Sequence, residues 1–457
     1  MSKDPRDTGL TEISVARPDP FVYALALLVV AYAIWLLTLW PGVLGEDSLA
    51  ILLEVQTHGT FTSGKPVFWY FFVKTFFEPT GLVEVPIGVQ LLLSAVVFAR
   101  ILGWCWAHGL RKTFAFLLVF VCLAPHMIFY MGSLYPDAIF TVAATGLLFE
   151  LWLIARTRRL SRASLLMCLL VFPFAVFART NGIVFLAAVL YAVALLERAD
   201  RIKLLAVALS WCVLVAAGQM SHDARSHDAL YPLALFETVN FMQPRPMNLW
   251  QERPRVSEKT IQTLTRYQPI QKIIENYDRD YWDPLIYKPD GPRLDLLSPA
   301  DKQIIVNEFF RYNLWQNIPA FLASRVNIFM VSSLAQGGLV SIEYAPYVLA
   351  QIRSESQFRR FHLTTLESVL ISVHLFSEKY RWLLWTPWLG IALLFMMVHR
   401  GFRAKSRPML IVAIPMAVQL LAIFALSIAG EYRYLLLFFT LPLVALPVLA
   451  TDAPNPP

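Results

Sequence analysis

Four short polar motifs hold the residues of this chain that are best suited to chemistry. They are Glu46-Asp47, Tyr135-Pro136-Asp137, Arg179-Thr180-Asn181 and Glu431-Tyr432-Arg433. A carboxylate can remove a proton from a reacting group, and the planar fork of donors on arginine binds and neutralises a phosphate. Together these residue types predict transfer of a group away from a phosphate leaving group. Lys65, which follows the first motif, adds a positive charge to the same set.

Each motif also has an interpretation without chemistry, and the motifs taken one at a time leave it open. Asp47 and Ser48 could cap the helix LAILLEVQ. Arg179 could extend to lipid headgroups, and Glu431 could simply pair with Arg433. The Tyr-Pro-Asp motif could be a turn with an acid at a helix N-terminus. The chemical interpretation therefore depends on whether the chain brings the motifs to one place.

The elements that must position these residues are membrane-spanning helices. The chain has 457 residues, of which 57% are hydrophobic and 16% charged, and its mean hydropathy is +0.55. Soluble domains carry about 25% charged residues, so the composition excludes an ordinary soluble enzyme and any disordered or fibrous protein. Residues 21–40 hold no charge, which suits a helix across a hydrocarbon core of about 30 Å.

The apolar segments predict an all-α polytopic membrane protein with about 10–12 transmembrane helices. Ten segments are long enough to predict spans: 21–40, 84–107, 113–131, 136–155, 163–178, 182–197, 203–219, 382–398, 408–429 and 432–450. Segment 66–77 is too short to span and suits a helix in the interface. Region 318–380 is ambiguous, and we expect it to cross twice or not at all.

The net charge of +7 is mostly a signal of topology. Four short loops contain 13 Lys and Arg residues against two acids: 108–112, 156–162, 197–203 and 399–407. Basic residues in short loops mark the cytoplasmic side. With a cytoplasmic N-terminus all four loops fall on that side, so no nucleic-acid partner is indicated. All four polar motifs then fall on the opposite face, in the periplasm if the chain comes from a bacterial inner membrane.

This topology divides the chain into four parts. They are a cytoplasmic tail (1–20), an N-terminal transmembrane module (21–218) with a first outer loop (41–83), a periplasmic soluble domain (219–317) and a C-terminal transmembrane module (318–457). The soluble segment carries 13 acidic and 12 basic residues. Its patterns predict helices at 262–277 and 298–317, the second with Ser298 as cap and Pro299 at the first position. We expect Tyr281, Trp282 and Asp283 to serve its core, although such residues also suit sugar contacts.

The segment PGVLGEDSLAILLEVQTHGTFTSGKPVFWYFF (41–72) resembles the first outer loop of GT-C membrane glycosyltransferases. In that superfamily an acidic residue soon after the first span is the catalytic base, followed by a glycine-containing turn and an apolar helix that begins at proline. The Tyr-Pro-Asp, Arg-Thr-Asn-Gly and Glu-Tyr-Arg-Tyr motifs are also similar to those of bacterial members. Many members have histidine where this chain has Lys65.

The resemblance implies an enzyme that moves a sugar from a polyprenyl phosphate, or diphosphate, to a glycan, lipid or protein acceptor outside the cytoplasm, usually with inversion. It assigns the general base to Asp47, with Glu46 as its rival. It assigns the donor phosphate to Arg433 and Arg179, assisted by Lys65. The remaining candidates for substrate binding are Asp137, Glu431, Tyr135, Asn181 and Tyr432.

Cofactor use and the class of protein both have alternatives. A divalent cation, Mg²⁺ or Mn²⁺, could bind between Asp47 and Asp137, although no cofactor is certain. A transporter or flippase of a lipid-linked saccharide is the main rival. Transporters tend to place ionisable groups at the membrane midplane and to contain repeated halves, and no repeat is visible here. A ligase or polymerase acting on lipid-linked glycans would use similar arginines.

Overall fold

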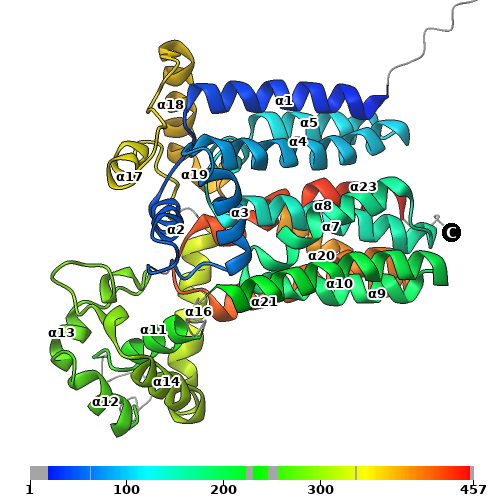
Figure 1. Ribbon diagram of the computed structural model, residues 1–457. Coiled ribbons are helices and arrows are strands. Elements are labelled where there is room, and N and C mark those ends of the chain that lie inside the picture. The colour runs from blue at the N-terminus through cyan, green and yellow to red at the C-terminus, as the bar shows by residue number, and fades with distance from the viewer. Residues whose placement is uncertain (1–18, 62, 223–229, 245–255, 335–336, 453–457) are drawn as a thin grey trace, which may run out of the picture.

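The structure is a computed structural model that describes residues 19–61, 63–222, 230–244, 256–334 and 337–452. In this part of the chain every named element is a helix, and β pairing is limited to isolated bridges. Long helices lie side by side in a bundle, and shorter helices gather at one of its ends (Figure 1). The all-α architecture is therefore confirmed.

The bundle contains all ten segments that the sequence predicts as spans. Its helices are α1 (Pro20–Thr38), α4 (Glu84–Ala107), α5 (Arg111–Leu123), α6 (Pro125–Met131), α7 (Pro136–Thr157), α8 (Arg162–Phe177), α9 (Val184–Leu195), α10 (Arg198–Ser221), α19 (Arg381–Leu384), α20 (Trp388–Arg403), α21 (Arg407–Leu426), α22 (Leu436–Thr440) and α23 (Pro442–Thr451). Two 3₁₀ helices, η1 (Thr180–Ile183) and η5 (Tyr432–Leu435), precede α9 and α22.

Fewer of these helices reach full membrane length than the sequence predicts. Within the described ranges seven are long and apolar enough to cross a membrane, and α5 with α6 makes an eighth if this pair, bent by 52°, counts as one span. The bend lies at Pro125, which is the first residue of α6. Helices α8 and α9 are shorter because the chain between them turns through the polar Arg179 segment.

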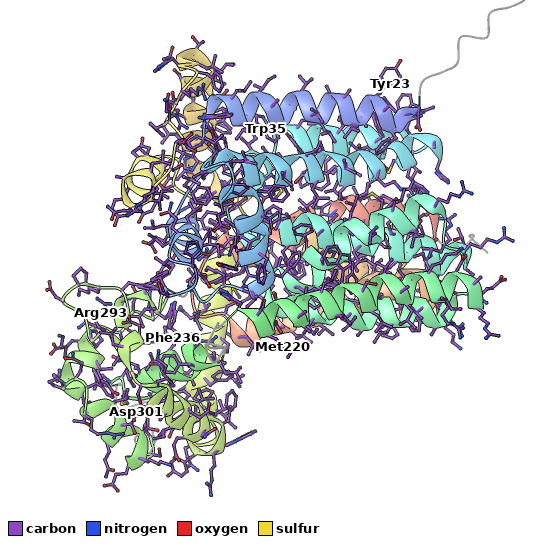
Figure 2. The ribbon with its side chains drawn as sticks, in the orientation of Figure 1. Tyr23, Trp35, Met220, Phe236, Arg293 and Asp301 are labelled. Carbon is purple, nitrogen blue, oxygen red and sulfur yellow. The ribbon has the colours of Figure 1, made fainter. Side chains whose placement is uncertain are left out.

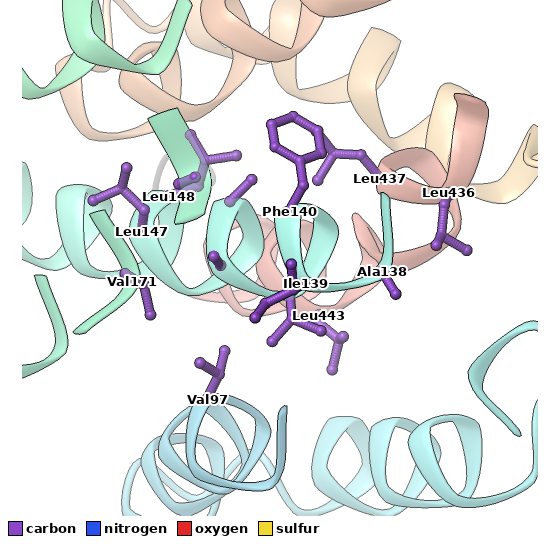
Figure 3. Close-up of a cluster of buried hydrophobic side chains, with 14 of the residues drawn as sticks. Val97, Ala138, Ile139, Phe140, Leu147, Leu148, Val171, Leu436, Leu437 and Leu443 are labelled. Atoms are coloured by element: carbon purple, nitrogen blue, oxygen red, sulfur yellow. The ribbon is translucent and has the colours of Figure 1, made fainter. Parts of the chain in front are cut away.

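Helix α7 is the centre of the bundle. Its side chains from Pro136 to Ala155 are all buried. They pack against α4, α8, α22 and α23, as the contacts of Val97, Val171 and Leu443 in Figure 3 illustrate. An ion pair also joins α7 to α4, because Arg100 Nε lies 2.9 Å from Oε1 of the buried Glu150. Since α7 begins at the second polar motif, the best-packed helix of the molecule positions Asp137.

The outer surface of the bundle is apolar, as expected for contact with lipid. Tyr23 and Val30 on α1 and Val213 on α10 are each more than half exposed. Figure 2 shows Tyr23 pointing away from the bundle. Exposed apolar side chains on this scale are unusual on a soluble protein and mark a membrane-facing surface. Together with the seven apolar helices, they identify a multi-pass membrane protein.

The four basic loops lie at one end of the bundle, and the short helices lie at the other. The described chain begins and ends at the basic end (Figure 1). Two of these loops touch there, because the Leu160 N–H donates to Asp200 Oδ2 at 2.9 Å. The opposite end carries α2 (Glu46–Gln56), α3 (Val67–Phe77), α17 (Ala345–Gln351) and α18 (Thr364–Lys379).

Region 318–380 contributes no candidate span among its described residues. Helix α16 (Ile318–Ser333) is apolar but too short, and α18 fails the test altogether. Of the two sequence alternatives, the structure therefore favours no crossing. The connection 353–359 instead ties the ends of α1, α2 and α4 together. The Gln56 side chain bonds twice to the backbone of Arg353, at 2.5 and 3.1 Å, and Ser354 Oγ donates to Gly81 O at 2.8 Å.

A second hydrophobic core lies beyond this end of the bundle, and we call the segment around it (230–321) the cap. The core is built from side chains between Tyr231 and Ala320, including those of α11 (Tyr231–Phe241), α12 (Glu258–Thr265), α13 (Ile270–Glu275) and α14 (Pro299–Glu308). The prediction of one helix at 262–277 is wrong, because the chain turns between α12 and α13 and Pro269 caps the latter. Ser298 caps α14 as predicted, and Pro299 is its first residue. The predicted helix 298–317 continues through a π-helical turn, η4 (Phe309–Asn313), and α15 (Leu314–Gln316).

Candidate active site at one end of the bundle

Backbone pairing brings the first two polar motifs together. The Val43 N–H donates to Gly132 O at 3.0 Å, and the Leu134 N–H donates to Val43 O at 3.2 Å. Ser48 Oγ adds a bond to Leu134 O at 3.1 Å. The start of α2 is therefore fixed beside the start of α7, although 90 residues separate Asp47 from Asp137 in the sequence.

Asp47 does not occupy the N-cap position of its helix. Helix α2 starts at Glu46, one residue before Asp47, and Gly45 is its N-cap. Ser48 Oγ accepts from the Gly45 N–H at 3.2 Å, so the capping interpretation of Asp47 is wrong. Gly45 is required for a close approach, since a Cβ there would lie 1.8 Å from the Tyr135 hydroxyl.

Two cations hold the Asp47 carboxylate. Its Oδ2 lies 2.7 Å from Lys65 Nζ and also contacts Arg433 Nη1. The three side chains are between 14% and 22% exposed, so they are mostly shielded from water. Lys65 comes from the loop before α3, and Arg433 comes from η5 near the other end of the chain. The structure thus joins residues 386 positions apart.

Glu431 holds the other side of the Arg433 guanidinium. Its Oε1 accepts from Arg433 Nη2 at 3.0 Å, and its Oε2 contacts Nε. Two backbone bonds fix this loop, since the Gly430 N–H donates to Asp280 O at 2.9 Å and the Gly338 N–H donates to Gly430 O at 3.1 Å. Arg433 is consequently oriented by two carboxylates, with its planar face left to aromatic rings.

A second arginine lies beyond an aromatic ring. Arg179 pairs with Asp137, whose carboxylate is only 3% exposed. The Tyr434 ring centroid lies 5.4 Å from the Arg179 guanidinium carbon and 5.5 Å from that of Arg433. Tyr135 flanks Arg433 at 5.3 Å. The site therefore combines three cations with three carboxylates and two aromatic rings.

Three predicted site residues lie outside the ion-paired cluster. Tyr432 is fully buried and stacks on Trp385, with ring centroids 5.7 Å apart. Asn181 bonds twice to Gln419 of α21, at 3.0 and 2.6 Å, and so ties down the Arg179 turn rather than lining the site. Glu46 is exposed and makes no ion pair within the described ranges, so Asp47 is the acid that contacts the cations.

Tyr434 takes the place that the sequence suggests for Tyr432, and η5 explains why. A 3₁₀ helix has three residues per turn, so side chains at i and i+3 share one side. Glu431 precedes η5 and Tyr434 lies three residues later, which puts both beside Arg433. Tyr432 and Leu435 share the opposite, buried side. The only sign of the role of Tyr434 in the sequence is that Arg433 has a tyrosine on each side in the Gly-Glu-Tyr-Arg-Tyr motif.

The cap contributes residues on the approach to the site. Tyr281 Oη donates to Gly430 O at 3.2 Å, while Trp282 packs against the cap core as expected. Asp283 follows them, and its pKa is raised to about 6 by burial and then by the negative charges of Glu431 and Glu46. The cap therefore places a carboxyl group that titrates near neutral pH within the electrostatic field of the site.

The charges of the site set the protonation of Asp47. Burial opposes its ionisation, but the positive charges of Lys65 and Arg433 outweigh burial and hold the pKa of Asp47 well below the ordinary aspartate value. Burial lowers the pKa of Lys65, and Asp47 counteracts only part of that effect. Asp47 is thus ionised at neutral pH but is masked by its partners.

A metal site is not supported by the arrangement of carboxylates. Asp47 is paired with Lys65 and Arg433, and Asp137 is paired with Arg179. Within the described ranges no three His, Cys, Asp or Glu side chains form a group that could hold a metal ion. Each carboxylate of the cluster is instead neutralised by a cation.

No protein-family model, no curated protein and no solved structure matches the chain.

Proposed function

We propose that this protein is a membrane glycosyltransferase that moves a sugar from a polyprenyl-phosphate carrier to a glycan, lipid or protein acceptor. The observation that carries the proposal is the Asp47 carboxylate held between Lys65 and Arg433, with Arg179 beyond Tyr434. A base next to phosphate-binding cations is what displacement of a sugar from a phosphate requires.

Donor binding would unmask the base. A phosphate that binds Arg433 and Lys65 competes with Asp47 for the same donors. The phosphate also neutralises the positive charges that lower the pKa of Asp47, so the carboxylate becomes a stronger base. Because Asp47 is masked without donor, this arrangement delays base catalysis until the donor is bound.

The proposed reaction is a single displacement with inversion. Asp47 takes the proton of an acceptor hydroxyl or amine. The lone pair of that acceptor oxygen or nitrogen forms a bond to the anomeric carbon. The bond from that carbon to the phosphate oxygen breaks, and the electron pair leaves on polyprenyl phosphate. Arg433 and Lys65 stabilise the charge that develops on this leaving group.

The proposed orientation places the site outside the cytoplasm. The four basic loops lie at the opposite end of the bundle, and basic loops favour the cytoplasmic side. In a bacterial inner membrane the site would face the periplasm at the level of the lipid phosphates. This is where the phosphate of a lipid-linked donor lies.

A transfer assay tests the proposal. The full chain is reconstituted in vesicles with a polyprenyl-phosphate donor carrying a radiolabelled sugar, and glycan, lipid and peptide acceptors are offered in turn. We expect labelled product and free polyprenyl phosphate in equal amounts. A matched sample follows movement of the intact donor between leaflets. Movement of the donor without any transfer would contradict the proposal and favour the flippase.

A further inference from the structure

A buried carboxylate outside the cation cluster shares a helix face with Asp47. Glu54 lies seven residues after Asp47 on α2, which is about two helical turns, so both side chains project from the same side. The Glu54 side chain is only 4% exposed. A buried charge is costly unless every oxygen has a partner, so the partners of Glu54 indicate its role.

Both oxygens of Glu54 are occupied. Its Oε2 accepts from the Ser63 backbone N–H at 2.9 Å and from the Ser63 hydroxyl. Its Oε1 lies 3.0 Å from Nε2 of His222, the residue that follows α10. His222 in turn stacks on Tyr70 of α3, with ring centroids 4.1 Å apart. One carboxylate therefore connects α2, the loop before α3, α3 itself and the end of α10.

Ser63 connects Glu54 to Lys65. Its Oγ accepts from the Lys65 backbone N–H at 3.2 Å, and the Lys65 ammonium reaches Asp47 at 2.7 Å. The loop is thus attached to α2 at two points on one face, by Glu54 through Ser63 and by Asp47 through Lys65. Gly59 permits this packing, since its φ is +83° and a Cβ there would lie 2.9 Å from His222.

We propose that Glu54 is a positioning residue that holds Lys65 against Asp47 by anchoring Ser63. Its consequence for catalysis rests on the function proposed above, whereas its geometric role does not. Without the anchor the loop keeps its sequence and charge but loses the fixed start of the segment that carries Lys65. A purely structural role in capping or stabilising α2 would leave the separation of Lys65 and Asp47 unchanged.

A zero-length cross-link measures this separation directly. Carbodiimide joins an amine to a carboxylate only when they touch, so Lys65 and Asp47 should couple in the full chain in vesicles. Lys74 of α3 and Glu78, the residue that follows this helix, are 3.9 Å apart and provide an internal reference for the same chemistry. Mass spectrometry of the digested protein gives the ratio of the two cross-linked peptides.

Variants of the anchor should change this ratio in a defined order. Loss of the buried hydrogen bonds to the Glu54 carboxylate should lower the Lys65–Asp47 yield roughly tenfold in Glu54→Ala. The yield should fall less in Ser63→Ala, which keeps the backbone N–H bond to Glu54. Glu54→Gln keeps an acceptor for Ser63 and should retain most of the yield. Thr60→Ala removes an exposed hydroxyl from the same loop, bonded at 2.9 Å to Thr57 O, and should leave the yield unchanged.

The outcomes separate this inference from the proposed function. An unchanged ratio in folded Glu54→Ala and Ser63→Ala would overturn the positioning role, whatever the transfer assay gives. If the variants reduce the ratio but the wild-type protein transfers no sugar, the positioning role is supported and the proposed function is rejected. If both hold, Ser63→Ala should raise the KM for the donor more than it lowers kcat.

Discussion

At the scale of single residues, the main feature is an acid masked by the cations that a substrate would occupy. Asp47 touches both Lys65 and Arg433. Pairing of this kind is stable only while nothing else competes for the donors, and a phosphate is a strong competitor. The ligand therefore decides whether the carboxylate acts as a partner of the cations or as a base.

Substitution of Arg433 tests the importance of its planar fork. Arg433→Lys retains the positive charge but cannot contact Asp47 and Glu431 with separate donors. We expect the KM for the donor to rise roughly tenfold or more, since hydrogen bonds between charged groups are lost. Steady-state kinetics would measure this. Arg360→Lys, on an exposed residue away from the site, is the matched control, and an equal KM in both variants would contradict the role of the fork.

The raised pKa of Asp283 predicts a dependence of stability on pH. The folded protein binds this proton more tightly than the unfolded chain, whose aspartate has a pKa of 3.8. The destabilising contribution of Asp283 is therefore absent below that pH and complete above about pH 6. Asp283→Asn should raise the melting temperature at pH 7 but not at pH 3.5. The exposed Asp290→Asn should do neither, and a shift at both pH values would be inconsistent with this cause.

Residue types were predictable from the sequence, but their side-chain directions were not. Asp47, Lys65, Asp137, Arg179, Glu431 and Arg433 do lie together. The sequence motif favours Tyr432 over Tyr434, because it does not reveal that a 3₁₀ turn follows Glu431. Asn181 is a polar residue in the right motif, yet its amide finds a partner on α21 that only the packed bundle provides.

At the scale of elements, a buried ion pair joins the cap to α16, which packs against α21 of the bundle. Arg325 of α16 and Glu237 of α11 are in contact, and both side chains are fully buried. Arg325 Nη1 also contacts the carbonyl oxygen of Ser427, just after α21. Because Glu431 and Arg433 follow a few residues later, the ion pair fixes the backbone just before the loop that carries these two residues.

Breaking this pair should destabilise the protein strongly. Arg325→Met leaves the Glu237 charge buried without its partner, which typically costs about 3–5 kcal/mol. Thermal unfolding in detergent should show a large decrease in the midpoint, and the double variant with Glu237→Gln should recover part of it. Arg293→Met, at an exposed pair with Asp295 in the cap, should change little. A similar midpoint for Arg293→Met and Arg325→Met would refute the role of burial.

Long apolar helices were predictable, and their interruptions were predictable only in part. Hydropathy locates all ten bundle segments because lipid-facing and buried positions are both apolar. It does not reveal that α8 and α9 fall short of membrane length around the Arg179 turn. Region 318–380 shows the same limit, since the Arg325 that makes it ambiguous is neutralised by Glu237, a residue 88 positions away.

At the scale of the whole molecule, the protein has two ends of different chemistry. One end carries the basic loops, and the other carries the cation–carboxylate cluster with the cap beside it (Figure 1). The prediction that the four polar motifs share one end depends only on the alternation of spans. The contacts within the cluster depend on the folded chain, because they join α2, α7 and η5 to the loop before α3 and to the Arg179 turn.

Labelling of single cysteines tests the orientation of these ends. In a variant lacking the four native cysteines, Lys405→Cys marks a basic loop and Glu343→Cys marks the opposite end, and both positions are exposed. A membrane-impermeant maleimide added to spheroplasts should label Glu343→Cys and spare Lys405→Cys until the membrane is broken. The reverse pattern would place the site in the cytoplasm and rule out the proposed location.

The most direct test of the central claim is the transfer rate of Asp47→Asn in vesicles with the labelled polyprenyl-phosphate donor. This variant keeps the size of the side chain but cannot accept the acceptor's proton, so we predict a loss of at least about 10²-fold in kcat. Glu343→Gln, an exposed acid outside the cluster, should retain the wild-type rate. A folded Asp47→Asn protein that transfers sugar at the wild-type rate would contradict the assignment of Asp47 as the base.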